Sequence, residues 1–147
     1  MGTTFTASDV AAFEHATWSR CAPGYEEGFA VLSSEGAGAI LDRANVGKDS
    51  KVLDVGTGTG GVAGAALERG ASVVGIDFSE AMISEARRMI PTADLRVANA
   101  EALPFEDGSF DAVVGNGVLH HLGEPDRALR ESLRVLKEGG RVAHTIW

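Results

Sequence analysis

Three features of the sequence predict a doubly wound α/β domain, in which a parallel sheet carries helices on both faces. The 147 residues are 44% hydrophobic, which is enough for the core of one ordinary domain. From Lys51 onward, short apolar runs alternate with helical stretches. Glycines cluster directly after the first apolar run, where the backbone must turn sharply or approach a ligand closely. Such an alternation predicts parallel strands joined by right-handed crossovers.

The short apolar runs are the predicted strands, because continuous hydrophobicity is typical of strands buried on both faces. The five of them cover Lys51–Val55, Ser72–Asp77, Leu95–Ala98, Asp111–Gly115 and Arg141–Trp147. The helices between them begin and end at capping signals, such as a serine or proline at the start and a glycine after the last turn. They cover Val62–Arg69, Ser79–Met89 and Pro125–Lys137, the last with an apolar stripe of Leu129, Leu133 and Leu136.

Residues 1–50, which precede the first strand, are predicted to be a helical segment. Ser8 or Asp9 is the expected cap of a first helix that runs to about Arg20. Pro23-Gly24 separates it from a second helical stretch at Glu26–Ala44. We therefore expect an N-terminal segment, 1–50, and a core, 51–147, within a single domain overall.

Composition and charge exclude several classes of function. The formal net charge is −8, from 21 acidic and 13 basic residues, and no basic cluster is present to bind a nucleic-acid backbone. The sequence shows neither the pattern of a signal peptide nor an apolar run long enough for a membrane span. Cys21 is the only cysteine, so no internal disulfide is possible. We expect a cytoplasmic protein whose partners include neither nucleic acid nor membrane.

The glycine-rich turn is the main indication of function. Gly56, Gly58, Gly60 and Gly61 follow the first strand and open a helix, so backbone N–H groups and a helix N-terminus face whatever lies there. Three of these glycines also fit the GxGxxG spacing of dinucleotide-binding domains. The turn therefore predicts a nucleotide-like cofactor and leaves its identity open.

Two aspartates flank this turn along the sequence. Asp77 ends the second strand, where a carboxylate can accept hydrogen bonds from the ribose of either kind of cofactor. Asp54 directly precedes the turn, where a carboxylate would repel a pyrophosphate and attract a cationic amino-acid group. Asp54 could equally accept backbone N–H bonds within the loop. Its charge nevertheless favours a cationic cofactor over a dinucleotide.

Four motifs in order resemble the class I S-adenosylmethionine-dependent methyltransferases, in particular the branch of the ubiquinone and menaquinone biosynthesis methyltransferases (methyltransferase type 11 domain). The motifs are VLDVGTGTGG, VVGIDFSEAMI, NAEALPFEDGSFDAVV, and LHHL followed by RALRESLRVLKEGG. The resemblance runs from Lys51 to Trp147. It implies a Rossmann-like fold, S-adenosyl-L-methionine as the cofactor, and methyl transfer to a small-molecule substrate.

The resemblance also implies which residues hold the cofactor. Asp77 would bind both ribose hydroxyls, and the glycines would lie against the methionine part. Asn99 stands where the family usually has an aspartate that accepts a hydrogen bond from the adenine amino group, and its carbonyl can still accept that bond without a charge. The full set of expected cofactor contacts is Tyr25, Asp54, Gly56, Gly58, Gly60, Asp77, Phe78, Met82, Asn99, Ala100 and Asn116.

Several of these residues have individual expectations. Phe78 and Met82 would flank the adenine, although Met82 is equally compatible with ordinary core packing. Ala100 could offer its backbone N–H to the ring. Asn116 follows the fourth strand, at the carboxyl ends of the strands where open α/β sheets bind ligands. Trp18 and Tyr25 resemble aromatic residues that fold over the cofactor in this family, and core packing is the open alternative.

His120 and His121 are the candidate catalytic residues, because a histidine near the transferred methyl group could take a proton from the substrate. Both could instead only shape the loop before Pro125, since methyl transfer to a good nucleophile needs alignment more than acid–base help. His15 and His144 have no companions in the sequence and are expected to be structural or exposed. The four histidines and Cys21 lack a metal-binding spacing, so no metal is expected.

The last predicted strand leaves the organisation of the protein open. The family's sheet continues with a further helix and two strands, so Arg141–Trp147 would be an edge strand with unpaired backbone groups. We expect either a piece of a longer protein or a homodimer formed across that edge. Two alternatives to a methyltransferase remain at this point, namely an NAD(P)-binding oxidoreductase domain and a module that binds S-adenosylmethionine without catalysis.

Overall fold

A five-stranded parallel sheet forms the centre of the computed structural model, which describes residues 6–22 and 35–146. Its strand order is β3-β2-β1-β4-β5. The strands are β1 (Lys51–Val55), β2 (Ser72–Asp77), β3 (Asp94–Val97), β4 (Phe110–Asn116) and β5 (Leu136–Thr145). The order reverses between β1 and β4, which makes the sheet doubly wound and places a crevice at their carboxyl ends. The predicted Rossmann-like fold class is confirmed.

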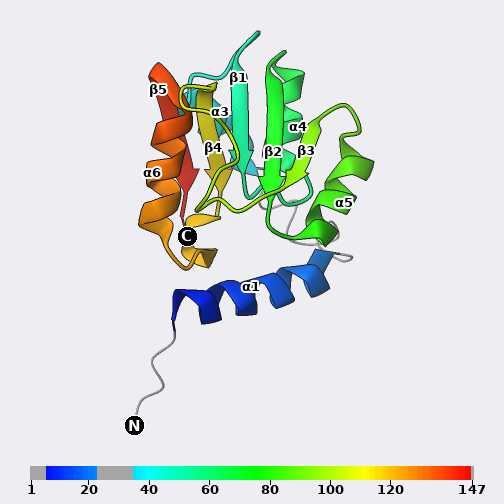
Figure 1. Ribbon diagram of the computed structural model, residues 1–147. Helices are drawn as coiled ribbons and strands as arrows, with labels where there is room; N and C mark the ends of the chain where they lie inside the picture. The colour runs from blue at the N-terminus through cyan, green and yellow to red at the C-terminus, as the bar shows by residue number, and fades with distance from the viewer. Residues whose placement is uncertain (1–5, 23–34, 147) are drawn as a thin grey trace.

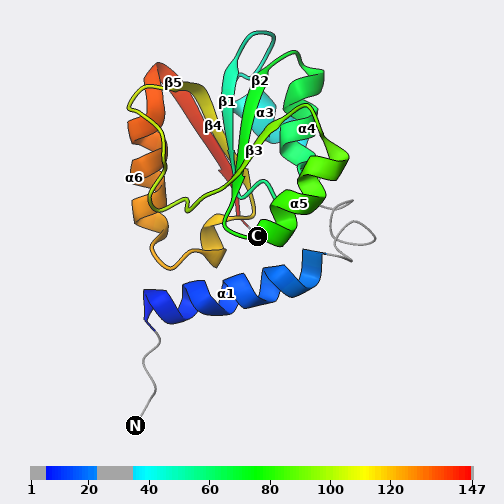
Figure 2. The same ribbon diagram turned by 45° about the vertical axis from the view of Figure 1, so that its right-hand side comes forward.

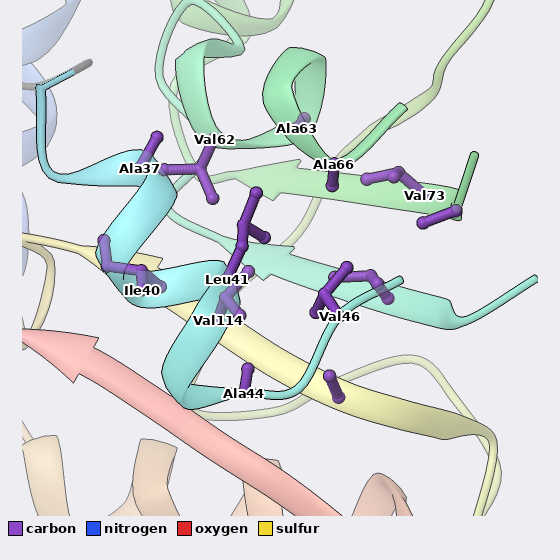
Figure 3. Packing of buried hydrophobic residues seen from close by; sticks show 13 residues of the cluster. Ala37, Ile40, Leu41, Ala44, Val46, Val62, Ala63, Ala66, Val73 and Val114 are labelled. Atoms are coloured by element: carbon purple, nitrogen blue, oxygen red, sulfur yellow. The ribbon is translucent and has the colours of Figure 1, made fainter. Parts of the chain in front are cut away.

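Helices cover both faces of the sheet, with α6 (Pro125–Val135) on one side and three helices on the other (Figure 2). Those three are α3 (Ala37–Arg43), α4 (Gly61–Glu68) and α5 (Glu80–Met89). Leu41 of α3 is completely buried among residues of α4 and the strands (Figure 3). On the sheet itself, Val52 packs in this cluster and its neighbour Leu53 packs in the cluster that faces α6. Alternate burial on two sides explains why the strands are apolar throughout.

Helix α1 (Ala7–Cys21) lies across the carboxyl ends of the strands (Figure 1). It contacts α5 and the short 3-10 helix η2 (Leu119–His121). Its cap is Thr6, so the expected cap at Ser8 or Asp9 is wrong. The Thr6 hydroxyl accepts a hydrogen bond from the Asp9 N–H at 3.2 Å, and the Asp9 carboxylate accepts one from the Thr6 N–H at 2.9 Å. Asp9 is thus the third helical residue of a capping box.

The predicted bounds of α6 and its apolar stripe are also wrong. The helix ends at Val135 rather than Lys137, because Leu136 is extended and pairs with Phe110. Its buried residues are Ala128, Ser132 and Val135, whereas Leu133 is 63% exposed. Both sets have helical spacing, and the small Ala128 and Ser132 side chains let the helix approach the sheet closely.

Strand β5 begins five positions before the predicted Arg141, because a bulge interrupts its pairing with β4. Phe110 pairs with Leu136 and Ala112 pairs with Arg141, so residues 137–140 have no matching length of β4. Gly139 lies in this bulge with a φ of +81°, a conformation that favours glycine. Residue 147 lies outside the described part of the chain, as do residues 23–34, which include Tyr25 and much of the second predicted helix. Within the described ranges, no helix is long and apolar enough to cross a bilayer.

Candidate functional site

Three adjoining cavities lie at the carboxyl ends of the strands, between the sheet and α1. The largest, of about 210 Å³, reaches from Asp77 to Asn99 and Ala100. A second, of about 70 Å³, lies between Trp18 and Asn116. A third, of about 30 Å³, lies against the glycine turn and Asp54. Gly56 borders all three, so together they form one elongated site along the crevice of the sheet.

The glycine turn forms the floor of this site. Gly56, Gly58 and Gly60 all have positive φ values, of +67°, +55° and +97°. A Cβ on Gly56 would lie 2.5 Å from Cγ2 of Val118, whereas a Cβ on Gly58 would meet nothing within 4 Å and so faces open space. A Cβ on Gly60 would lie 2.6 Å from Cδ1 of Ile90. Gly60 therefore packs α5 against the turn, and it borders none of the three cavities.

Asp54, at the inner end of the site, is a buried carboxylate that is only partly satisfied. Its side chain is 1% exposed, and its Oδ2 accepts a hydrogen bond from the Thr57 hydroxyl at 2.7 Å. Its Oδ1 has no hydrogen-bond partner among the residues that the structure describes. Burial raises the pKa of Asp54 to about 7, against the opposing effect of the Thr57 hydroxyl. The Ala63 N–H also opposes the shift, and the carboxyl group as a whole lines the third cavity.

Asp77 lies at the middle of the site, where it lines the two larger cavities. Its Oδ2 accepts a hydrogen bond from the Gly58 N–H at 3.0 Å and its Oδ1 accepts one from the Ser79 N–H at 2.9 Å. Burial raises the pKa of Asp77, and these two N–H groups oppose that shift. Each oxygen keeps a lone pair for a further donor. Asp77 thus ties β2 to the glycine turn and still faces the cavities.

The remaining expected cofactor contacts divide between the cavities. Asn99 and Ala100 line the largest of the three cavities. The side-chain Oδ1 of Asn99 already accepts a hydrogen bond from the Glu101 N–H at 2.9 Å. Phe78 lines the two larger cavities, whereas the buried Met82 lines only the second. Asn116 lines the second and third, and its side-chain oxygen accepts a hydrogen bond from the Thr145 hydroxyl. Tyr25 lies outside the described residues.

The two candidate catalytic histidines differ in their positions. His121 lines both larger cavities, and its Nδ1 lies 3.0 Å from Oε2 of Glu14. His120 is exposed and lines none of the three cavities, and its ring lies 4.1 Å from that of His121. Burial is the main cause that lowers the pKa of His120, followed by the adjacent His121.

Sequence reasoning missed the contribution of α1 beyond Trp18. Ala11, Glu14 and His15 also line the largest cavity. His15, which was expected to have no companion, has its ring centroid 5.6 Å from that of Phe78. The residues that line the cavities recur at positions 11, 14, 15 and 18, which is the spacing of one helical face. This face mixes small, charged and aromatic side chains, so no apolar periodicity marks it.

Comparison with known proteins decides between the cofactors that the glycine turn leaves open. Residues 53–144 match the family described as Methyltransferase domain. The chain belongs to this methyltransferase family. The match runs from within β1 to within β5, and it confirms the resemblance to the class I S-adenosylmethionine-dependent methyltransferases. It argues against the NAD(P)-binding alternative.

Two curated relatives show how similar the chain is to individual methyltransferases. The demethylmenaquinone methyltransferase of Renibacterium salmoninarum is 40% identical over 103 residues, which are 70% of this chain and 44% of that protein. The malonyl-[acyl-carrier protein] O-methyltransferase of Enterobacter lignolyticus is 32% identical over 130 residues, which are 88% of this chain and 51% of that protein. The methyltransferase chain therefore spans about half the length of these curated relatives.

A solved structure supports the same fold. A chain from the complex between the Haloferax volcanii Trm112 methyltransferase activator and a methyltransferase is 30% identical, with a TM-score of 0.81. The match covers 88% of this methyltransferase chain and 59% of that one. The coverage of this chain exceeds the family match, so the similarity in fold extends beyond the motifs.

Proposed function

We propose that this chain binds S-adenosylmethionine and transfers its methyl group to a small-molecule acceptor. The observation that carries the proposal is the elongated site itself, which runs from the buried carboxylate of Asp54, past Asp77, to Asn99. S-adenosylmethionine is an elongated molecule with an amino-acid group, a ribose and an adenine. Along its length, the site offers chemical groups that suit these three parts in turn.

The inner end of the site suits the amino-acid group. A cationic ammonium beside Asp54 would supply the positive charge that the unpartnered Oδ1 lacks, and would favour the ionised carboxylate. A pyrophosphate in the same place would meet a buried carboxylate, which disfavours a dinucleotide. The open space at Gly58 leaves the backbone of the turn accessible there.

The middle and outer parts suit a nucleoside. The carboxylate of Asp77 has spare acceptor positions on both oxygens, as a pair of ribose hydroxyls requires. Beyond it, Ala98, Ala100 and Leu122 give the largest cavity apolar walls for a flat ring, and the Asn99 amide lies at its edge. The Asn99 carbonyl keeps one lone pair for the adenine amino group after its bond to the Glu101 N–H.

When bound, the cofactor supplies an electrophilic methyl group on a positively charged sulfur. The protein's part is to align that group with the acceptor and to exclude water, and alignment alone supplies a large share of the rate in such displacements. Asp77 and the glycine turn would fix the cofactor from below. Trp18 and His15 of α1 would close the other side of the site, which is the covering role that the resemblance implies for Trp18.

Calorimetry tests the proposed cofactor directly. S-adenosylhomocysteine, the product form, is expected to bind to the purified protein, whereas NADP is expected to show no heat of binding. Binding of NADP without S-adenosylhomocysteine would overturn the proposal. Transfer of a radiolabelled methyl group to small-molecule acceptors then separates an enzyme from a module that only binds the cofactor.

The location and oligomeric state belong to the same proposal. A cytoplasmic protein fits a cofactor that is made and consumed there, and one exposed thiol at Cys21 fits a reducing compartment. β5 is the last strand in the sheet order of the described residues, so its outer edge offers backbone groups either to further strands of a longer protein or to a second copy of the chain. Sedimentation equilibrium should then show dimers, and a monomer at high concentration would contradict pairing through this edge.

A further inference from the structure

One carboxylate of α1 connects the helix to the loop after β4. Oε2 of Glu14 accepts a hydrogen bond from Nε1 of Trp18 at 2.9 Å and lies 3.0 Å from Nδ1 of His121. The side chains of Glu14 and His121 are 16% and 26% exposed, so both are largely screened from solvent. The Trp18 ring also meets the His121 ring edge-on, with centroids 5.0 Å apart. His121 is thus held from two directions by the helix that covers the site.

This arrangement fixes which ring nitrogen of His121 is available. A carboxylate accepts hydrogen bonds and does not donate them, so we place the proton of the neutral ring on Nδ1, the nitrogen 3.0 Å from Oε2 of Glu14. In the neutral ring, Nε2 is then the proton acceptor. His121 lines both larger cavities, and the second of them also contains Gly58, Asp77 and Asn116. His120, its neighbour, shares the residue type but lines none of these cavities.

We infer that Glu14 is a positioning residue that holds His121 as the general base of the proposed methyl transfer, and that the acceptor attacks the methyl group through a hydroxyl oxygen. The inference rests on the proposed function. A hydroxyl is a weak nucleophile near neutral pH and gains from a base, whereas a thiolate is already deprotonated and would not need one.

The proposed step balances as follows. The hydroxyl oxygen of the acceptor forms a bond to the methyl carbon, and the bond between that carbon and the sulfur breaks. Its electron pair stays on the sulfur, which becomes a neutral thioether. The hydroxyl proton passes to Nε2 of His121, and the carboxylate of Glu14 stabilises the resulting imidazolium. Solvent takes the proton after the product leaves.

Other titratable groups share the surroundings of His121. Glu14 and His15 belong to α1, His120 is adjacent in the chain, and Asp77 and Glu101 line the same cavity. Of these, Glu14 is the carboxylate in contact with the ring. Its charge can therefore be removed alone, and the Glu14→Gln variant keeps an oxygen that can accept the bond from Nδ1.

Histidine NMR of protein saturated with S-adenosylhomocysteine gives a readout that needs no acceptor. In the wild-type protein, the neutral His121 ring is expected to carry its proton on Nδ1. In Glu14→Ala, which removes the acceptor, this preference for Nδ1 should be lost. The His121→Gln variant assigns the signals of His121, and Asp126→Asn, which removes an exposed carboxylate on α6, should leave the tautomer unchanged. A neutral ring protonated on Nε2 in the wild-type protein, or an unchanged preference for Nδ1 in Glu14→Ala, would overturn the inference.

Methyl transfer to catechol, a hydroxylated probe, provides the kinetic readout. His121→Gln should lower kcat about 100-fold, and Glu14→Gln should lower it about tenfold. Both variants should still bind S-adenosylhomocysteine, with at most about a fivefold loss of affinity, which also shows that they are folded. Equal kcat in wild type and His121→Gln, or no transfer to catechol by a wild-type protein that binds S-adenosylhomocysteine, contradicts the inference.

The two proposals can fail separately. If the wild-type protein does not bind S-adenosylhomocysteine, the proposed function is wrong and the inference falls with it. If it binds and His121 is insensitive to Glu14, only the inference is wrong, and the proposed cofactor stands.

Discussion

The floor and the roof of the candidate site are built in different ways. The floor is the glycine turn between β1 and α4, in which positive φ values and buried carboxylates fix the backbone. The roof is α1, a helix of 15 residues that buries none of them. It reaches the site through the side chains of Glu14, His15 and Trp18. The floor therefore belongs to the core, and the roof rests on it.

This difference separates stability from binding. A substitution in the floor disturbs backbone conformation and packing, each of which costs on the order of 1 to 3 kcal/mol. A contact of the roof is a partly exposed side-chain interaction, typically worth roughly 0 to 1 kcal/mol. We expect substitutions in the floor to lower both stability and affinity, and substitutions in the roof to lower affinity alone.

The largest expected effect is at Gly56. Gly56→Ala would place a methyl group 2.5 Å from the Val118 side chain at a φ of +67°, and should lower the free energy of unfolding by about 2 to 5 kcal/mol. Urea unfolding measures it. Gly58→Ala is the matched control, because its added methyl group meets no atom within 4 Å at a φ of +55°. The control should cost about 1 to 2 kcal/mol yet still weaken binding of S-adenosylhomocysteine. Equal losses of stability in the two variants would contradict the distinction.

The next effect concerns the pH dependence of the floor. The pKa of Asp54 is raised from its ordinary value of 3.8 to about 7 in the folded protein, so the folded state stays protonated to a higher pH than the unfolded chain. Its contribution to stability is fully present below about pH 4 and is lost as the pH rises to about 7. The difference between wild type and Asp54→Asn should therefore change by about 2 to 4 kcal/mol across this window.

The comparison with Asp54→Asn is needed because His144 acts in the opposite direction. Burial lowers the pKa of His144 to about 4, so its contribution to stability is lost as the pH falls from about 6.5 to 4. Urea unfolding of both proteins at several pH values removes the contribution of His144 to the comparison, because that contribution is the same in wild type and Asp54→Asn. A difference that stays constant from pH 4 to 7 would show that Asp54 is ionised throughout.

A smaller effect, on binding as well as on folding, is expected at Asp77. Asp77→Asn removes the charge and replaces one acceptor oxygen by an NH₂ group that opposes the Gly58 or Ser79 N–H. The affinity for S-adenosylhomocysteine should fall about 10- to 100-fold, the range of one lost charge-assisted hydrogen bond. Calorimetry measures it. Asp126→Asn, an exposed carboxylate on α6, is the control and should bind normally.

The smallest effect is expected in the roof. Trp18→Ala removes a wall of the second cavity and the hydrogen bond to Glu14, and should weaken binding of S-adenosylhomocysteine about three- to tenfold, or about 1 kcal/mol. The thermal midpoint of the unliganded protein should change little, since α1 buries no residue. A large fall in that midpoint would show that α1 is part of the core. Phe13→Ala is the control, because Phe13 is 67% exposed and lines no part of the site.

The elements that the sequence predicted well are those with local signals. Ser79 caps α5 as expected, with its hydroxyl accepting a hydrogen bond from the Met82 N–H, and Pro125 begins α6. The errors arose where the signal was shared. Two sets of residues in α6 have the same helical spacing, and only contact with the sheet decides that Ala128, rather than Leu133, is buried.

By itself, the sequence determined the fold class, the glycine turn and the four motifs of a methyltransferase, because strand runs, caps and tight turns depend on neighbours in the chain. Only the tertiary structure decided the strand order, the bulge before Arg141, the packing role of Gly60 and the position of His121, rather than His120, at the cavities. It also placed Glu14 against His121, although the two residues are 107 positions apart in the chain. Contacts between distant segments depend on how helices pack on the sheet, and no local pattern encodes that arrangement.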